Sequence, residues 1–243
     1  MNLTYYVGTC DKSDMLLAVS LLLQRSERKV LLIDGMSMPW LRYRNGSWIS
    51  KERWTSWNGL DTISGVRTWQ EVDRLAKDAE VKLDDYDDII VDTDLLALCS
   101  PQDLCKADTR FFVLTTESSM INRHLEWMVT YQNVHHQSFS DEFQLILMHA
   151  TDPEEDVHYV EQVMSSSGVH PSRETLVIPY DESDWIAKLR TDSNQEVLIK
   201  QYARATREVW RQLVESSTGP LTEREWRKVL KGPRKGSWYH EAM

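Results

Sequence analysis

The chain of 243 residues contains 41% hydrophobic and 27% charged residues, so it is long enough to bury the core of one α/β domain. Its net charge of −10 disfavours broad nucleic-acid binding, because phosphate backbones bind basic surfaces. The sequence has no run of about 20 apolar residues, as a membrane span requires, and no signal-peptide pattern, so we expect a cytoplasmic protein. Its cysteines include no C-x-x-C pair, which argues against a disulfide framework and a structural zinc site.

Strand and helix patterns alternate from the N-terminus. Residues 2–8 form a β-branched and aromatic run that ends at a glycine, which predicts a strand. Residues 13–24 are rich in Leu, Ala and Met and predict a buried helix, and residues 29–34 predict a second, fully buried strand. Strand, helix and strand within about 30 residues form a βαβ unit, whose crossover is right-handed.

Residues 36–67 are rich in tryptophan and basic residues and show little periodicity. We interpret them as a long insertion that is packed by its own aromatic side chains. Trp48, Trp54 and Trp57 are candidates for a partner-binding surface there, because tryptophan is enriched in interface hot spots. The insertion belongs to an α/β domain that we expect over residues 1–218.

The alternation of strands and helices resumes after the insertion. Helices are predicted at 68–79, 118–130, 153–166 and 196–215, and strands at 87–92, 111–115, 143–148 and 175–179. This order predicts a mostly parallel central sheet with helices on both faces. Ligands bind such sheets beyond the carboxyl ends of the strands. The residues expected at those ends are Gly8, Asp34, Asp92, Thr115 and His149.

The loop after the first strand carries part of a phosphate-binding motif. Lys12 and Ser13 begin the predicted helix, where a lysine would bind phosphate, a hydroxyl would bind Mg²⁺ and the helix dipole would favour an anion. Asp92 is a second candidate for the Mg²⁺ site. However, the loop keeps only Gly8, and Asp11 stands where the G-x-x-x-x-G-K-[ST] motif has its second glycine. The negative charge of this aspartate opposes phosphate binding.

The order of these segments resembles the ParA/MinD group of deviant P-loop ATPases over about residues 2–190. The matching segments are VGTCDKSDMLLAVSLLLQ, KVLLIDG, YDDIIVDTD, FFVLTTESSMINRHLEWM, QLILMHATD and LVIPYDESDW. The resemblance implies the P-loop fold, ATP and Mg²⁺ as ligands, and a homodimer that pairs across the nucleotide site. It assigns nucleotide binding to Gly8, Lys12, Ser13, Asp34, Asp92 and His149, with Ser13 and Asp92 at the metal.

Several positions depart from the pattern of that family. The glycine-rich loop is short and lacks the additional signature lysine, and the DGM sequence that starts at Asp34 lacks the second acid that serves in hydrolysis. Asp92 is followed by Thr-Asp in place of proline or glycine, and His149 stands where an asparagine is usual. These changes predict weak or lost hydrolysis. Divergent phosphate loops are known in the pilus-assembly branch of the family, which the sequence therefore favours slightly.

Residues 219–243 are predicted to form a basic C-terminal tail that contains one short helix. The basic side chains that could contact an acidic partner or an anionic membrane are those of Arg227, Lys228 and Lys231. Trp226, Val229 and Leu230 lie beside them and would supply a short apolar side for weak membrane contact. The alternative is a solvated, disordered tail.

Three functions remain open at this stage. A spatial organiser or assembly factor with a degenerate nucleotide site would position a partner machine, such as a pilus or secretion apparatus, a division site or a DNA cargo. A working Mg-ATPase would use Lys12, Ser13, Asp34 and Asp92. A nucleotide-independent scaffold would bind its partner through the tryptophan-rich insertion. On a purely structural interpretation, Asp34 and Asp92 cap neighbouring loops and Lys12 is an ordinary solvated lysine.

Overall fold

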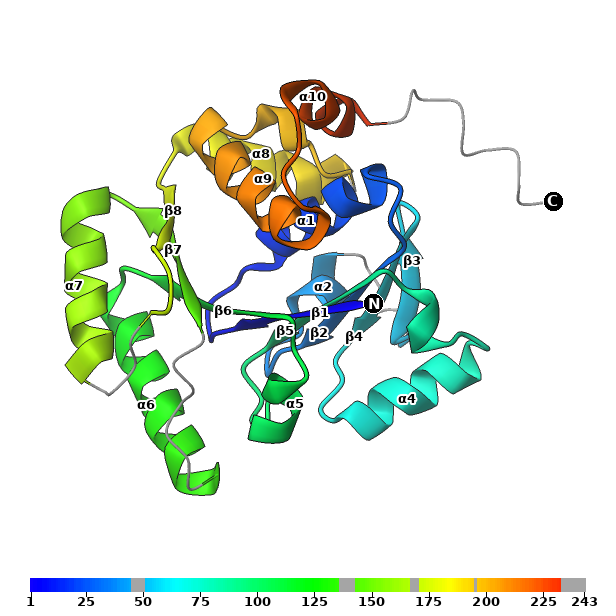
Figure 1. The fold of residues 1–243 in the computed structure, drawn as a ribbon, viewed down its shortest axis with the longest axis horizontal. Coiled ribbons are helices and arrows are strands. Elements are labelled where there is room, and N and C mark those ends of the chain that lie inside the picture. Colours follow the sequence, from blue (N-terminus) through cyan, green and yellow to red (C-terminus); the bar gives the residue numbers. More distant parts are fainter. Residues whose placement is uncertain (45–50, 136–142, 167–170, 195, 233–243) are drawn as a thin grey trace.

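The computed structural model describes residues 1–44, 51–135, 143–166, 171–194 and 196–232. One eight-stranded sheet runs through the molecule in the order β3-β4-β2-β5-β1-β6-β7-β8 (Figure 1). The strands are β1 (Asn2–Val7), β2 (Val30–Gly35), β3 (Trp54–Trp57), β4 (Leu60–Ser64), β5 (Asp88–Thr93), β6 (Thr109–Thr115), β7 (Gln144–Ala150) and β8 (Leu176–Pro179). The α-helices are α1 (Ser13–Arg25), α2 (Trp40–Arg44), α4 (Trp69–Asp78), α5 (Pro101–Cys105), α6 (Ser118–His135), α7 (Pro153–Ser166), α8 (Glu182–Asn194), α9 (Arg204–Thr218) and α10 (Glu223–Lys231).

The described strands pair in parallel, except for β3 with β4, which confirms the predicted mostly parallel sheet. β1 lies at the centre of the sheet between β5 and β6. In β5, Asp92 is level with Tyr6 of β1 on one side and with Asp34 of β2 on the other. The carboxyl ends of these strands therefore meet at one edge of the sheet, where a ligand site is expected.

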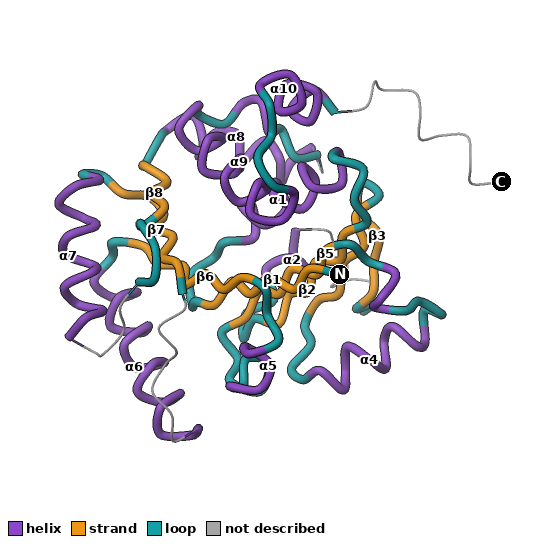
Figure 2. Tube along the Cα trace, in the orientation of Figure 1, coloured by secondary structure: helices purple, strands orange, loops and turns teal. Residues whose placement is uncertain are grey.

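Helices cover both faces of the sheet, as predicted, and the molecule has three layers (Figures 1 and 2). On one face α1, α9 and α10 enclose a core that contains Leu16 and Trp210. On the other face α4, α6 and α7 enclose a second core that contains Phe112 and Trp127. Because both faces of the central strands are buried, those strands appear in the sequence as continuous apolar runs.

The tryptophan-rich segment contains regular structure, contrary to the interpretation as a self-packed insertion. Strands β3 and β4 form an antiparallel hairpin, and β4 extends the sheet by pairing in parallel with β2. The turn residues Asn58 and Gly59 have φ values of 52° and 77°, as a two-residue type I′ turn requires. An Asn-Gly pair predicts such a hairpin, but the poor periodicity of the segment hides it.

Two predictions near the C-terminus need correction. The helix predicted over 196–215 begins only at Arg204, after a 3₁₀ turn at Ile199–Gln201. The sequence patterns do not predict helix α8, because it lacks a continuous buried apolar stripe. Its largest apolar side chains, Trp185 and Leu189, are 50% and 52% exposed, so its pattern does not resemble that of an ordinary core-facing helix.

The basic C-terminal segment begins with a well-capped helix, α10. The Thr222 side chain accepts a hydrogen bond from the backbone N–H of Glu225, whose side chain in turn caps Thr222. Trp226 and Val229 are only 6% and 4% exposed and pack into the core beside α1. The apolar side expected to touch a membrane is therefore buried, and that expectation is wrong. Over the described ranges, every helix is too short or too polar to cross a membrane.

Candidate phosphate-loop site

The loop after β1 lies against the neighbouring strands. Gly8 has a φ of +154°, and a Cβ at this position would lie 2.3 Å from the carbonyl oxygen of Val113. The Gly8 N–H donates to the carbonyl oxygen of Thr93 at 3.1 Å. The close approach of two backbones therefore explains the glycine, and its N–H is already bonded within the protein.

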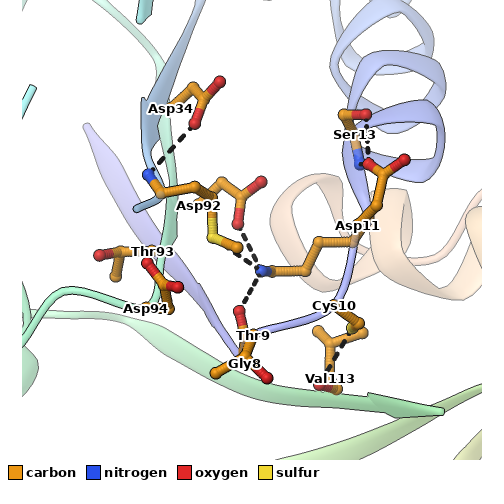
Figure 3. A network of polar contacts seen from close by, with 12 residues as sticks. Gly8, Thr9, Cys10, Asp11, Ser13, Asp34, Asp92, Thr93, Asp94 and Val113 are labelled. Atoms are coloured by element: carbon orange, nitrogen blue, oxygen red, sulfur yellow. Dashed lines mark hydrogen bonds and ion pairs between the residues drawn. The ribbon is translucent and has the colours of Figure 1, made fainter. Parts of the chain in front are cut away.

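The ammonium group of Lys12 lies between Asp92 and Gly8 at the carboxyl edge of the sheet (Figure 3). Its Nζ is 2.6 Å from Asp92 Oδ1, donates to the Gly8 carbonyl oxygen at 2.7 Å and is 3.3 Å from Met36 Sδ. Lys12 is 0% exposed. The interpretation of Lys12 as a solvated lysine is therefore wrong.

Lys12 and Asp92 form a buried ion pair. Burial would lower the pKa of Lys12, but the charge and hydrogen bond of Asp92, together with the charges of Cys10 and Asp94, outweigh burial and raise that pKa. Burial raises the pKa of Asp92 to about 6, although Lys12 acts to lower it. Both groups are therefore charged at neutral pH, and a protein carboxylate neutralises the ammonium group that would bind a phosphate.

Asp34 lies next to Asp92 in the sheet and binds backbone groups. Its Oδ1 accepts from the N–H of Met36 at 3.2 Å, and its Oδ2 accepts from the N–H of Leu41 at 2.9 Å. Burial, and then the charge of Asp92, raise the pKa of Asp34 well above its usual range. These bonds hold the chain between β2 and α2, as expected of a strand-end carboxylate that caps a neighbouring loop.

A carboxylate already occupies the N-terminus of α1. Asp11 Oδ1 accepts from the Ser13 Oγ at 2.6 Å and from the Ser13 N–H at 3.1 Å. Asp11 Oδ2 is 3.1 Å from Lys188 Nζ and 3.5 Å from Arg44 Nη2. Burial would raise the pKa of Asp11, but Lys188, the Ser13 hydrogen bonds and Arg44 outweigh it and lower that pKa to about 2. Asp11 is therefore ionised at neutral pH.

The predicted Mg²⁺ site does not fit this arrangement. The Ser13 hydroxyl is bonded to Asp11, and Asp92 Oδ1 is bonded to Lys12. Within the described residues, no group of three or more His, Cys, Asp or Glu side chains is placed to hold a metal ion. A phosphate at the start of α1 would meet the negative charge of Asp11. The loop as it stands therefore favours neither ligand.

Two residues that the sequence patterns did not single out complete the loop region. His124 of α6 is buried, and its Nε2 accepts from the N–H of Thr9 at 3.0 Å. Burial lowers the pKa of His124 to about 4, so its ring is neutral. Asp94, after β5, accepts from the N–H and the hydroxyl of Ser37 at 2.6 and 2.5 Å. No local pattern marks His124, because its contact with Thr9 depends on how α6 packs against β6.

His149 lines a cleft between β7, β8, α8, α9 and the first turn of α1, which contributes Asp14 and Met15. Its φ is +60°, which is uncommon for a residue with a side chain. The cleft has a free volume of about 30 Å³ and is lined also by Trp185, Lys188 and Trp210. That volume holds one or two water molecules and is too small for a nucleotide base. The cleft therefore places His149 near Lys188 and the first turn of α1, and Lys12 is not among its lining residues.

The predicted partner-binding residues differ in their exposure. Trp54 and Trp57 are partly buried and pack against the two cores, and Trp48 lies outside the described residues. The predicted basic residues that are exposed on α10 are Arg227, Lys228 and Lys231. The accessible candidates among the described residues are therefore the basic ones of α10.

No protein-family model and no curated protein sequence matches this chain. Several solved structures match this chain. A chain of the MinC:MinD cell division protein complex of Aquifex aeolicus has a TM-score of 0.57 at 15% identity and covers 91% of this chain and 99% of that chain. The ParA family ATPase of Chlorobium tepidum TLS has a TM-score of 0.56 at 18% identity, and the match covers 90% of this chain and 99% of that chain. McdA of Cyanothece in its ATP complex has a TM-score of 0.57 at 13% identity, and the match covers 91% of this chain and 98% of that chain. This chain therefore has the fold of MinD and the ParA-family ATPases, as its order of segments predicts.

Proposed function

We propose that this protein is a ParA/MinD-like spatial organiser or assembly factor that positions a partner machine and whose ATP hydrolysis is weak or lost. The observation that carries the proposal is the buried ion pair of Lys12 with Asp92 at 2.6 Å. The lysine that a phosphate loop offers to a nucleotide is here bound to the protein itself, and the sequence has no second acid after Asp34. A role in positioning a partner rests on analogy of fold, since MinD has been solved with MinC.

The partner machine would be a pilus or secretion apparatus, a division site or a DNA cargo. The altered phosphate loop slightly favours the pilus-assembly branch. The protein would act as a homodimer in the cytoplasm, or at the inner face of the membrane. In that case Arg227, Lys228 and Lys231 of α10 would supply the contact with an acidic partner or with anionic headgroups.

An exposed apolar surface on α8 supports a role in partner binding. It includes Tyr180, just before α8, which is 58% exposed. On α8 itself, Trp185, Ile186 and Leu189 are 50%, 41% and 52% exposed. Neighbouring large apolar side chains on a surface are typical of interaction sites. Asp181 and Glu182 lie at one end of this surface. The partner segment that fits both features is a basic, amphipathic helix.

The nucleotide part of the proposal is tested by titrating the full chain with a labelled ATP analogue, with and without Mg²⁺. We expect no binding up to millimolar concentration, because Lys12 would have to leave Asp92 and the phosphates would meet Asp11. Micromolar binding that disappears in a folded Lys12→Ala variant would instead show a working nucleotide site and favour the ATPase alternative. Circular dichroism of the variant confirms that it is folded.

The partner part is tested by following a fluorescent fusion in cells of the source organism. We expect discrete foci that a Trp185→Ser, Leu189→Ser double variant disperses. Tyr159→Ser is the matched control, because Tyr159 is also a large apolar residue, 47% exposed, but lies on α7. Foci that survive the α8 substitutions would show that the partner binds another surface. Equal dispersal by both variants would indicate general destabilisation.

A further inference from the structure

One carboxylate connects three elements that are far apart in the sequence. Asp11 Oδ1 accepts two hydrogen bonds from Ser13 at the start of α1. Asp11 Oδ2 is 3.1 Å from the ammonium group of Lys188 in α8 and 3.5 Å from the guanidinium group of Arg44 in α2. The Lys188 and Arg44 side chains are only 14% and 10% exposed, so little water screens these charges. We call these four residues the Asp11 clasp.

The partners of Asp11 are the kinds of donor that bind a phosphate group. They are a backbone N–H and a hydroxyl at a helix N-terminus, a lysine and an arginine. Two further acids share the cations: Asp14 is 3.5 Å from Lys188 Nζ, and Asp192 is 2.9 Å from Arg44 Nη1. Asp11 is the acid that contacts both cations and α1 together. The clasp is therefore a tertiary contact and more than a local helix cap.

We propose that the Asp11 carboxylate is a built-in substitute for a bound phosphate and holds α1, α2 and α8 in one arrangement without a nucleotide. The inference rests on the proposed function, because a triphosphate at this loop would have to displace Asp11. Beyond the loss of nucleotide binding, it assigns the place of the phosphate to the Asp11 carboxylate. The arrangement of the three elements is then permanent and does not depend on nucleotide concentration.

The clasp also connects the loop to the apolar surface of α8. Lys188 lies over the ring of Trp185, with Nζ 5.4 Å from the ring centroid. The same lysine thus contacts Asp11 on one side and the exposed Trp185 on the other. By fixing Lys188, the clasp keeps the proposed partner surface of α8 in a constant orientation.

Inorganic phosphate is the direct probe of this substitution. We compare the thermal unfolding of the full-length wild type and Asp11→Asn, with phosphate or with chloride at equal ionic strength. Asp181→Asn is the matched control, because Asp181 makes the same two bonds to its own Ser183, at 2.8 and 2.5 Å, at the start of α8. We expect Asp11→Asn to lower Tm more than Asp181→Asn does, and phosphate to recover part of that loss for Asp11→Asn alone.

Equal losses of Tm in the two aspartate variants would overturn the proposal, as would a phosphate effect that is absent from Asp11→Asn or equal in all three proteins. If Asp11→Asn does not fold, Lys188→Gln and Arg190→Gln are compared by hydrogen exchange. Both cations belong to α8, but Arg190 bonds to Gln201 and Lys188 to Asp11. Faster exchange in α2 and α8 of Lys188→Gln alone is expected, and equal exchange in both variants contradicts the clasp.

These outcomes separate the clasp from the proposed function. Wild-type protein that binds the ATP analogue would refute the loss of nucleotide binding, whatever Asp11→Asn does. Wild-type protein that binds no ATP, together with an Asp11→Asn variant that is indifferent to phosphate, would refute the clasp and leave the organiser role standing.

Discussion

Two Asp-x-Ser sequences begin two helices of this protein, and they differ in what surrounds them. Asp11 accepts bonds from Ser13 at 3.1 and 2.6 Å before α1, and Asp181 accepts bonds from Ser183 at 2.8 and 2.5 Å before α8. Asp11 also contacts cations from two other elements, whereas these bonds of Asp181 lie within its own turn. A local cap therefore becomes a tertiary contact only where packing brings opposite charges to it.

The largest effect is expected next to Asp11, at the buried ion pair. Lys12→Met should lower the free energy of unfolding by about 3–5 kcal/mol, because it leaves Asp92 buried without its cation. Chemical denaturation measures the loss. Adding Asp92→Asn should recover part of it, since the uncompensated charge is then removed. Lys106→Met, at a lysine that is 72% exposed, should change stability little; an equal loss there would contradict the assignment.

The loop backbone should be the next most sensitive feature. Gly8→Ala is expected to cost about 2–3 kcal/mol, because the new Cβ would lie 2.3 Å from the Val113 carbonyl oxygen. Gly219→Ala is the control, since Gly219 also has a positive φ but no atom within 4 Å of a built Cβ. We expect a loss of about 1–2 kcal/mol there, from backbone strain alone. Equal losses in equilibrium denaturation would mean that backbone strain, and not the contact with β6, explains Gly8.

The Asp11 carboxylate should make stability depend on acid. Its pKa of about 2 lies below the value of about 3.9 in an unfolded chain. A lowered pKa stabilises the fold above the unfolded value, so the contribution of about 2 kcal/mol is complete above pH 5 or so and is lost as the pH falls towards 2. Asp14 and Asp192 face the same two cations, Lys188 and Arg44. Denaturation curves of Asp11→Asn and wild type should therefore converge at low pH, and a constant difference would argue against this assignment.

The smallest effect is expected at Asp181. Hydrogen bonds from Ser183 lower the pKa of Asp181 too, but the carboxylate is open to solvent. Asp181→Asn keeps an acceptor for the Ser183 N–H and should change stability far less than Asp11→Asn does. Strong salt dependence of the Asp181→Asn loss would reveal a charge partner and would remove the contrast between the two turns.

Much of this site was predictable from the sequence, and the decisive contacts were not. The loop that contains Lys12, and the strand ends at Asp34 and Asp92, follow from apolar runs that stop at polar residues. One hypothesis treats Lys12 as a solvated side chain. Its ion pair with Asp92 could be predicted only from the register of β1 against β5. His124 and Lys188 could not be linked to the loop, because 115 residues separate Thr9 from His124 and 177 separate Asp11 from Lys188.

Local sequence patterns alone determined the α/β class, the order of most strands and helices, and the resemblance of that order to ParA and MinD proteins. They did so because buried parallel strands and core-facing helices impose apolar periodicities that neighbouring residues reveal. The tertiary structure alone decided which charges meet. Asp11, Lys188 and Arg44 come from three separate elements, and the energy of their contact depends on distance and burial, which no spacing along the chain specifies.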